Sequence, residues 1–234
     1  MNKKELLEKF QKTPEKYWYL NFFKTSGFKR KKCKGCGKYF WTLNHDQEIC
    51  NDSSCRSYEF IGNPLTKRKF EYLSLWKKIK KFFEDEGHTH VKRYPVVCRW
   101  FPDLYFTIAG VVDFYRRDGE DFVFELPANP VVILQPSLRF NDIPQIGVSG
   151  RHLTCHSHLE QSSLYDGKRG YWKERCIELD FRMLTEILGI KPDLINFIED
   201  VWLGPGAFGY SLEYHVGGLE LGNAVFTEFK GTPE

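Results

Sequence analysis

The sequence has 234 residues, of which 41% are hydrophobic, enough for one large domain or for a domain with a small module. Its net charge at pH 7 is +3, and no apolar run approaches the length of a membrane span, so we expect no membrane protein. Seven cysteines without a secretory signal favour a cytoplasmic protein, in which cysteines are metal ligands or free thiols rather than disulfides.

The first segment of the chain is strongly basic. Residues 1–32 contain ten Lys or Arg and three Glu, so their net charge is 10 − 3, or +7. Such a segment attracts polyanions such as RNA; a solvated, Lys-rich surface is the alternative. Residues 2–12 have helical periodicity. The aromatic cluster in residues 17–23 is expected to pack inside a small module rather than stack on bases.

Four cysteines form two closely spaced pairs, Cys33 with Cys36 and Cys50 with Cys55. Each pair lies in a turn, and two such turns can direct four thiolates toward one tetrahedral zinc ion. We expect structural zinc, because residues 1–63 are too few to be held together by a hydrophobic core alone; metal-free cysteines are the alternative. The dipeptide at residues 63–64, Asn-Pro, predicts the boundary with a larger domain, 64–234.

Apolar residues at three- and four-residue spacing predict a helix from about Lys67 to Glu86, and a second from about Trp172 to Leu188. Gly87 and Gly189 are expected to end them. The expected short strands are residues 95–97, 104–107, 121–126, 194–199 and 224–229. The Gly-rich stretch 204–209 lacks the Lys and Ser/Thr of a phosphate-binding loop, so we expect it to shape a small pocket.

The stretch 130–154 is the most informative part of the sequence. The apolar run 131–134 predicts a buried strand, Arg139 follows it, and residues 141–150 have the composition of a loop. Arg151 and His152 are expected to begin a second strand. An arginine offers a planar fork of hydrogen-bond donors that fits phosphate or carboxylate, so this hairpin predicts a binding site for a nucleotide phosphate. A surface hairpin with solvated arginines is the alternative.

Two segments resemble the second signature motif of class II aminoacyl-tRNA synthetases, and most of all that of the archaeal-type alanyl enzymes. They are residues 139–143, Arg-Phe-Asn-Asp-Ile, and residues 148–154, Val-Ser-Gly-Arg-His-Leu-Thr. The resemblance covers nearly the whole chain. It implies an α+β fold, in which an antiparallel sheet is flanked by helices, with a small N-terminal zinc-ribbon-like module.

Further segments carry the same resemblance. Residues 82–91 and 94–100 resemble the first motif of the family, whose helix lies at a dimer interface; a helix that packs only on its own domain is the alternative. Residues 198–202, 211–214 and 219–226 resemble the segments of its amino-acid pocket.

The resemblance also implies roles for single residues. Arg139 would bridge the amino-acid carboxylate and the α-phosphate of ATP, and Arg151 or His152 would contact the outer phosphates, with Mg²⁺ held mostly by phosphate oxygens and water. Trp202 would form a wall of the L-alanine pocket, and Asn223 would contact the polar end of alanine. A core aromatic and a strand-edge residue are the alternatives for these two.

The segment 155–158, Cys-His-Ser-His, departs from the family, which usually has an aromatic residue there that stacks on adenine. His156 occupies that place, and on a strand His158 would share its face. We expect both to contact the nucleotide of ATP rather than a metal.

The third motif of the family, a Gly-rich element ending in Gly-Leu-Glu-Arg, does not occur in the sequence, and neither does its editing or its tRNA-recognition region. The resemblance therefore implies the N-terminal catalytic portion of an alanine–tRNA ligase, which would form alanyl-adenylate for tRNA(Ala) only with a second chain that carries the third motif. The alternative is a non-catalytic synthetase-like module that binds RNA or protein.

Overall fold

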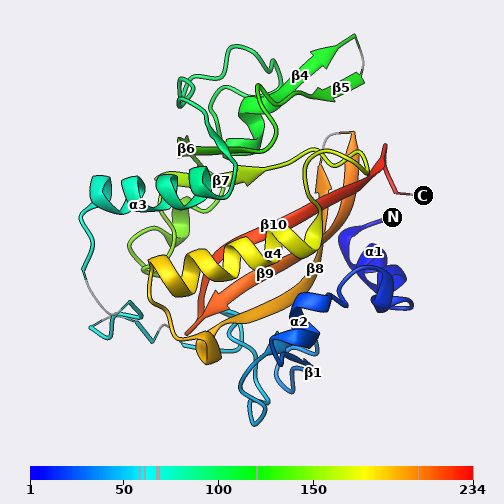
Figure 1. Cartoon of the computed structure of the whole chain (residues 1–234), viewed down its shortest axis with the longest axis vertical. Helices are drawn as coiled ribbons and strands as arrows, with labels where there is room; N and C mark the ends of the chain where they lie inside the picture. The colour runs from blue at the N-terminus through cyan, green and yellow to red at the C-terminus, as the bar shows by residue number, and fades with distance from the viewer. Residues whose placement is uncertain (58, 61, 67–68, 120, 205, 234) are drawn as a thin grey trace. The chain divides into compact units, whose positions relative to one another are not determined.

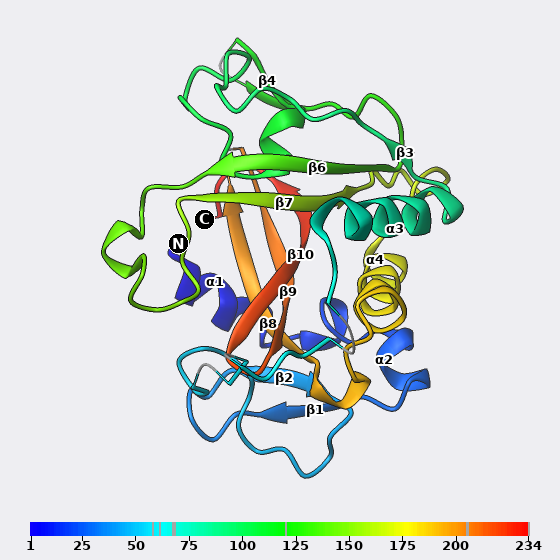
Figure 2. The same cartoon turned by 90° about the vertical axis from the view of Figure 1, so that its left-hand side faces the viewer.

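A computed structural model of the chain describes residues 1–57, 59–60, 62–66, 69–119, 121–204 and 206–233. They form two compact units, one of residues 1–69 with 173–234 and one of residues 70–172. Both units contain helices and mainly antiparallel strands (Figures 1 and 2), which agrees with the α+β class expected from the sequence. Within the described part of the chain, no helix has the length and apolar character needed to cross a membrane.

The first unit is built on a five-stranded antiparallel sheet in the order β1-β2-β8-β9-β10. Its strands are β1 (Lys29–Lys32), β2 (Tyr39–Thr42), β8 (Asn196–Gly204), β9 (Ala207–Val216) and β10 (Leu219–Lys230). Because β2 pairs with β8, the cysteine-bearing segment belongs to this sheet. This grouping differs from the boundary that the sequence suggested at residues 63–64, and the separate module stays a prediction.

The helices of the first unit are α1 (Lys3–Phe10), α2 (Asn21–Thr25) and α4 (Lys173–Arg182), which a π-helical turn, Met183–Ile187, continues. Figure 1 shows α4 lying across β9 and β10. The N-terminus of α2 is held by the Glu174 carboxylate of α4, which accepts the backbone N–H of Asn21 at 2.8 Å and of Phe22 at 3.1 Å. A carboxylate is favourable there because the first N–H groups of a helix have no partner within it.

The aromatic cluster of residues 17–23 packs into the core of this unit, as expected. Trp18 and Phe23 are fully buried, and the Trp18 indole N–H donates to the Ser211 carbonyl at 3.0 Å. Tyr19 is the exception, since 48% of its surface is exposed.

The second unit contains a three-stranded sheet, a two-stranded ribbon and one long helix. Its strands are β3 (Thr89–His90), β6 (Val131–Leu138), β7 (Cys155–Ser162), β4 (Tyr115–Asp118) and β5 (Asp121–Phe124). β6 is the central strand, parallel to β3 and antiparallel to β7. The short 3₁₀ helices are η2 (Gly110–Phe114) and η3 (Ile143–Gln145).

Helix α3 (Tyr72–Asp85) lies along β6 and β7 (Figure 2), and buries Ile79, Phe82 and Phe83. The sequence predicted its start at Lys67, which lies outside the described residues; the following Lys69 to Glu71 are not helical. Gly87 follows the helix with a φ of +90°, which confirms the predicted end.

Other strands differ from the prediction. The strands expected at residues 95–97 and 104–107 are reduced to one bridge between Val97 and Phe106. The second strand of the central hairpin begins at Cys155 rather than at Arg151. The Ser149 hydroxyl accepts the backbone N–H groups of Arg151 and His152, both at 3.2 Å, and holds this part of the chain as a turn.

Two carboxyl groups approach each other where η2 meets β7. Asp113 is fully buried, and neither of its oxygens has a hydrogen-bond partner within the described residues. A Cβ at Gly110 would lie 2.7 Å from Glu160 Oε2, so glycine at this position lets the Glu160 side chain pack against η2. Burial, and then the charge of Glu160, raises the pKa of Asp113 to about 7 against the weaker opposing effect of Arg116; burial raises the pKa of Glu160 to about 7.

This pair predicts that the free energy of unfolding falls as pH rises. Because the folded-state pKa of Asp113 is about 7 and its ordinary value is 3.8, the folded state holds a proton that the unfolded state loses between these values. Relative to the wild type, Asp113→Asn should gain about 3 kcal/mol between pH 5 and 8, at about 1.4 kcal/mol per pH unit up to pH 7. Urea unfolding at several pH values measures this. The exposed Asp118→Asn is the control, and a pH-independent difference for Asp113→Asn would contradict the prediction.

Candidate functional site

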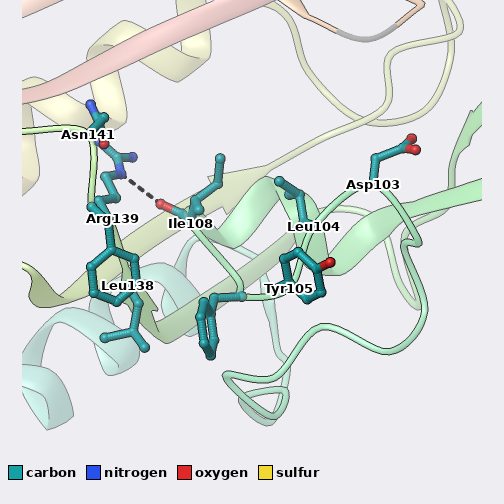
Figure 3. Close-up of a pocket in the computed structure, with 9 residues that line it drawn as sticks. Asp103, Leu104, Tyr105, Ile108, Leu138, Arg139 and Asn141 are labelled. Atoms are coloured by element: carbon teal, nitrogen blue, oxygen red, sulfur yellow. Dashed lines mark hydrogen bonds between the residues drawn. The ribbon is translucent and has the colours of Figure 1, made fainter.

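Arg139 follows β6 and is exposed to solvent. Its backbone N–H donates to the Thr154 carbonyl at 2.9 Å, and its Nε donates to the Ile108 carbonyl at 2.8 Å (Figure 3). Within the described part of the chain, its two terminal nitrogens have no hydrogen-bond partner. The guanidinium is therefore held in place at Nε while the rest of its donor fork remains available to an anion.

A cavity of about 530 Å³ opens beside this guanidinium (Figure 3). Besides Arg139 it is lined by Asp103, Leu104, Tyr105, Phe106, Ile108, Leu138, Phe140 and Asn141. Tyr105 is 88% exposed and Phe140 50% exposed. A cationic fork at the edge of an open, largely apolar cavity suits a ligand with both a ring and an anionic group.

The turn after the motif loop holds the other predicted phosphate ligands. Arg151 and His152 are half-buried, and the Ser149 hydroxyl lies 2.6 Å from His152 Nδ1. This contact orients the imidazole, so that Nε2 is the ring atom not engaged by Ser149.

His156 and His158 lie on β7 with ring centroids 6.0 Å apart. Burial, and then the positive charge of Arg139, lowers the pKa of both, that of His158 to about 4. Both imidazoles are therefore neutral at pH 7, and a neutral ring suits contact with a base better than contact with a phosphate. Neither histidine lines the cavity beside Arg139.

Trp202 and Asn223 belong to the first unit. Trp202 pairs with Gly209 of β9, and Asn223 pairs with Glu213 of the same strand, so both side chains project from one face of the sheet. A Cβ at Gly204 would lie 1.7 Å from the Trp202 ring, so glycine there is required by the position of the indole. The predicted Gly-rich loop is thus mainly the β8–β9 hairpin, whose residue 205 lies outside the described residues.

The same face carries a charged cluster that no local sequence pattern indicates. Carboxylate oxygens of Asp52 and Glu213 and a ring nitrogen of His215 lie within 4.8 Å of one another. Lys38 donates to Asp52 at 3.1 Å, and Lys3 bonds Asp200 at 2.6 Å. The residues come from segments far apart in sequence, so no local spacing could reveal them. Lys38 supplies the positive charge that these carboxylates require.

The four predicted zinc ligands do come together. The sulfur atoms of Cys33, Cys36, Cys50 and Cys55 all lie within 4.8 Å of one another. Burial opposes ionisation of Cys33, but the backbone N–H groups of Cys50, Cys36 and Gly35 outweigh it and lower its pKa to about 6. Four sulfur ligands at this separation could hold a tetrahedral zinc ion, and four protein ligands are the number found in structural zinc sites.

Comparison with known proteins identifies the family. A family model described as tRNA synthetases class II (A) matches residues 76–220. The chain belongs to this family. The matched residues of this class II synthetase chain include the Arg139 hairpin, β8 and β9, and they end at the start of β10.

Curated archaeal relatives are similar to this synthetase chain over nearly all of its length. Proteins named Alanine--tRNA ligase are 53% identical in Nitrosopumilus maritimus, 49% in Cenarchaeum symbiosum and 42% in Archaeoglobus fulgidus, over 99%, 99% and 94% of the chain. The chain spans about a quarter of these relatives: 26%, 26% and 24%.

The structure thus distributes the predicted site residues of this synthetase over both units. Arg139, His156 and His158 lie near one another in the second unit, and Arg151 and His152 follow in the same hairpin. Trp202 and Asn223 share a sheet face in the first unit, together with the charged cluster that contains Glu213.

Proposed function

We propose that the chain is a catalytic portion of an alanine–tRNA ligase, which joins L-alanine to the α-phosphate of ATP and passes the alanyl group to tRNA(Ala). The observation that carries this proposal is the Arg139 guanidinium, fixed through Nε and open at its terminal nitrogens beside a cavity. The names of the archaeal relatives support alanine as the amino acid.

The chemistry requires no nucleophile from the protein, because the alanine carboxylate itself attacks the α-phosphorus of ATP, and pyrophosphate leaves as the bond between the α-phosphorus and the bridging oxygen breaks. The protein must align the reactants and stabilise charge on the five-coordinate phosphorus. Arg139 would bridge the carboxylate and the α-phosphate through its free fork. Arg151 and His152 would contact the outer phosphates, which Mg²⁺ accompanies, and the neutral His156 and His158 would contact the base.

On the first unit, the half-buried Trp202 would form a wall of the alanine pocket, and the exposed Asn223 would contact the polar end of alanine. The four cysteines would hold a structural zinc ion, which suits a reducing cytoplasm. Class II first-motif helices form dimer interfaces, and α3 exposes Tyr72 (56%) and Leu73 (66%) as candidates for such a contact.

The complete reaction also needs the third motif and the tRNA-recognition parts of such an enzyme. We propose that a second polypeptide supplies them. The assay therefore compares the chain by itself, the chain mixed with the remaining three quarters of an archaeal relative, and the chain joined to them.

Arg139→Ala tests the proposal in alanine-dependent ATP–pyrophosphate exchange. Loss of one preorganised donor to the developing charge typically costs about 3 kcal/mol, so exchange should fall by two to three orders of magnitude. Arg139→Lys should recover little, because an ammonium cannot replace the bidentate fork.

The control is Arg93→Ala, which removes an exposed arginine of the same unit. Near-normal exchange by Arg139→Ala would remove this residue from the reaction. If neither the mixed nor the joined protein shows exchange, the non-catalytic module becomes the better explanation.

A further inference from the structure

β1 is an edge strand made entirely of cations. It lies at one end of the five-stranded sheet and consists of Lys29, Arg30, Lys31 and Lys32. Arg30 is committed to the buried carboxylate of Glu199, and Lys31 donates to the His45 carbonyl at 2.7 Å. Lys29 and Lys32 are exposed and, among the described residues, form no ion pair.

Aromatic side chains alternate with these cations. The Arg30 guanidinium lies 3.7 Å from the centroid of the Tyr39 ring and 5.7 Å from that of Tyr19. The Lys32 ammonium lies 5.7 Å from the Tyr39 ring. Tyr19 is 48% exposed although its neighbours Trp18 and Leu20 are buried, so its ring is presented to solvent at this edge.

A shallow cavity of about 390 Å³ lies beside Tyr19. Its lining includes Lys24 and Lys29 at the basic end and Phe28 and Trp41 as apolar surface. A concave surface with one exposed aromatic ring and a row of cations has the two elements that bind single-stranded nucleic acid, a stacking platform and an electrostatic track.

We propose that β1, with Tyr19 and Lys24, is an RNA-binding surface that contacts phosphates through its lysines and stacks a base on Tyr19. Charge complementarity favours RNA over a protein strand, because a strand added to this edge would face four consecutive cations. That the RNA is tRNA rests on the proposed function; that the surface binds RNA rests on the geometry.

The test is binding of a labelled tRNA(Ala) transcript to the full chain at several salt concentrations. The double variant Lys29→Gln/Lys32→Gln should weaken binding about fivefold per lysine at ~0.1 M salt, and should reduce the slope of log K against log salt by about 1.4, since each phosphate contact contributes about 0.7. Lys77→Gln/Lys191→Gln, which removes two exposed lysines outside the basic N-terminal segment, is the charge-matched control and should change neither value substantially.

Tyr19→Ala separates stacking from charge. It should weaken binding about fivefold or more with an unchanged salt slope, and Tyr19→Phe should restore binding because the ring face is kept. Melting curves of each variant check that the fold is intact.

The proposal is overturned if the two pairs of lysine substitutions weaken RNA binding equally. It is also overturned if the β1 variant binds RNA normally but self-associates, since the lysines would then serve to prevent edge-to-edge pairing of the sheet. Alanine-dependent exchange needs no RNA, so the outcomes separate. If exchange is observed but β1 does not bind RNA, only the proposal of an RNA-binding surface is refuted. If β1 binds RNA but no exchange is observed, only the proposed ligase activity is refuted.

Discussion

Cys36→Ser is expected to abolish zinc binding and to lower the melting temperature sharply, whereas Cys155→Ser should change neither. Both thiols are exposed, so serine costs little through burial at either position, and the two variants differ in whether a ligand is lost. A structural zinc site in a small peptide contributes about 10–16 kcal/mol of apparent binding free energy at pH 7, which greatly exceeds ordinary substitution effects.

The local packing explains why loss of the metal should destabilise residues beyond the four cysteines. The buried cluster at this site consists of Cys33, Phe40, Cys50 and Ile198, so two of its four members are themselves ligands. Without zinc, little apolar surface remains to hold the 33–55 loops. Because Phe40 pairs with Ile198, disorder there reaches the pairing of β2 with β8 inside the sheet.

Metal analysis after purification in reducing buffer should find one zinc per chain for the wild type and for Cys155→Ser. Thermal melting with and without a chelator then measures the stabilisation. If the chelated wild type melts at the same temperature as the zinc-loaded protein, the four cysteines are not a structural metal site.

The cysteine cluster shows what local spacing can predict. Two short Cys pairs brought together by turns were sufficient to anticipate four sulfur atoms within 4.8 Å. The Arg139 hairpin was predictable for the same reason, since an apolar strand, a polar loop and a returning strand are consecutive. The start of its second strand was placed too early, because the Ser149 hydroxyl competes for the N–H groups that a strand would need.

Long-range pairing could not be predicted in this way. No residue near Asp52 or Lys38 in the sequence indicates that these side chains will contact Glu213 and His215. The contact arises because β2 lies next to β8, and β8 next to β9, in the folded sheet. The same limit applies to the grouping of residues 1–69 with residues 173–234 in one compact unit, while the module boundary at residues 63–64 stays a prediction. The periodicity of a sequence predicts a single strand but does not identify the strand with which it pairs.

Arg30→Ala is the last variant expected to have a large effect, on the stability of the first unit. The Glu199 side chain is completely buried, and it accepts Nε and a terminal nitrogen of Arg30 at 2.6 and 2.7 Å and the Trp41 indole N–H at 3.0 Å. Removal of Arg30 leaves a buried carboxylate with one neutral donor, which should cost about 3–5 kcal/mol. Arg169→Ala, which breaks the exposed pair with Asp166, should have little effect on stability, because solvent screens that pair.

The double variant Arg30→Met/Glu199→Gln distinguishes the buried charge from lost packing. If the uncompensated carboxylate dominates, neutralising it should recover much of the stability that Arg30→Met loses, because an amide can still accept the Trp41 N–H without a buried charge. Urea unfolding of the two single variants and the double variant gives the coupling energy directly. Additive losses would show that Arg30 stabilises the sheet mainly through its stacking on Tyr39, and the ion pair would then contribute little.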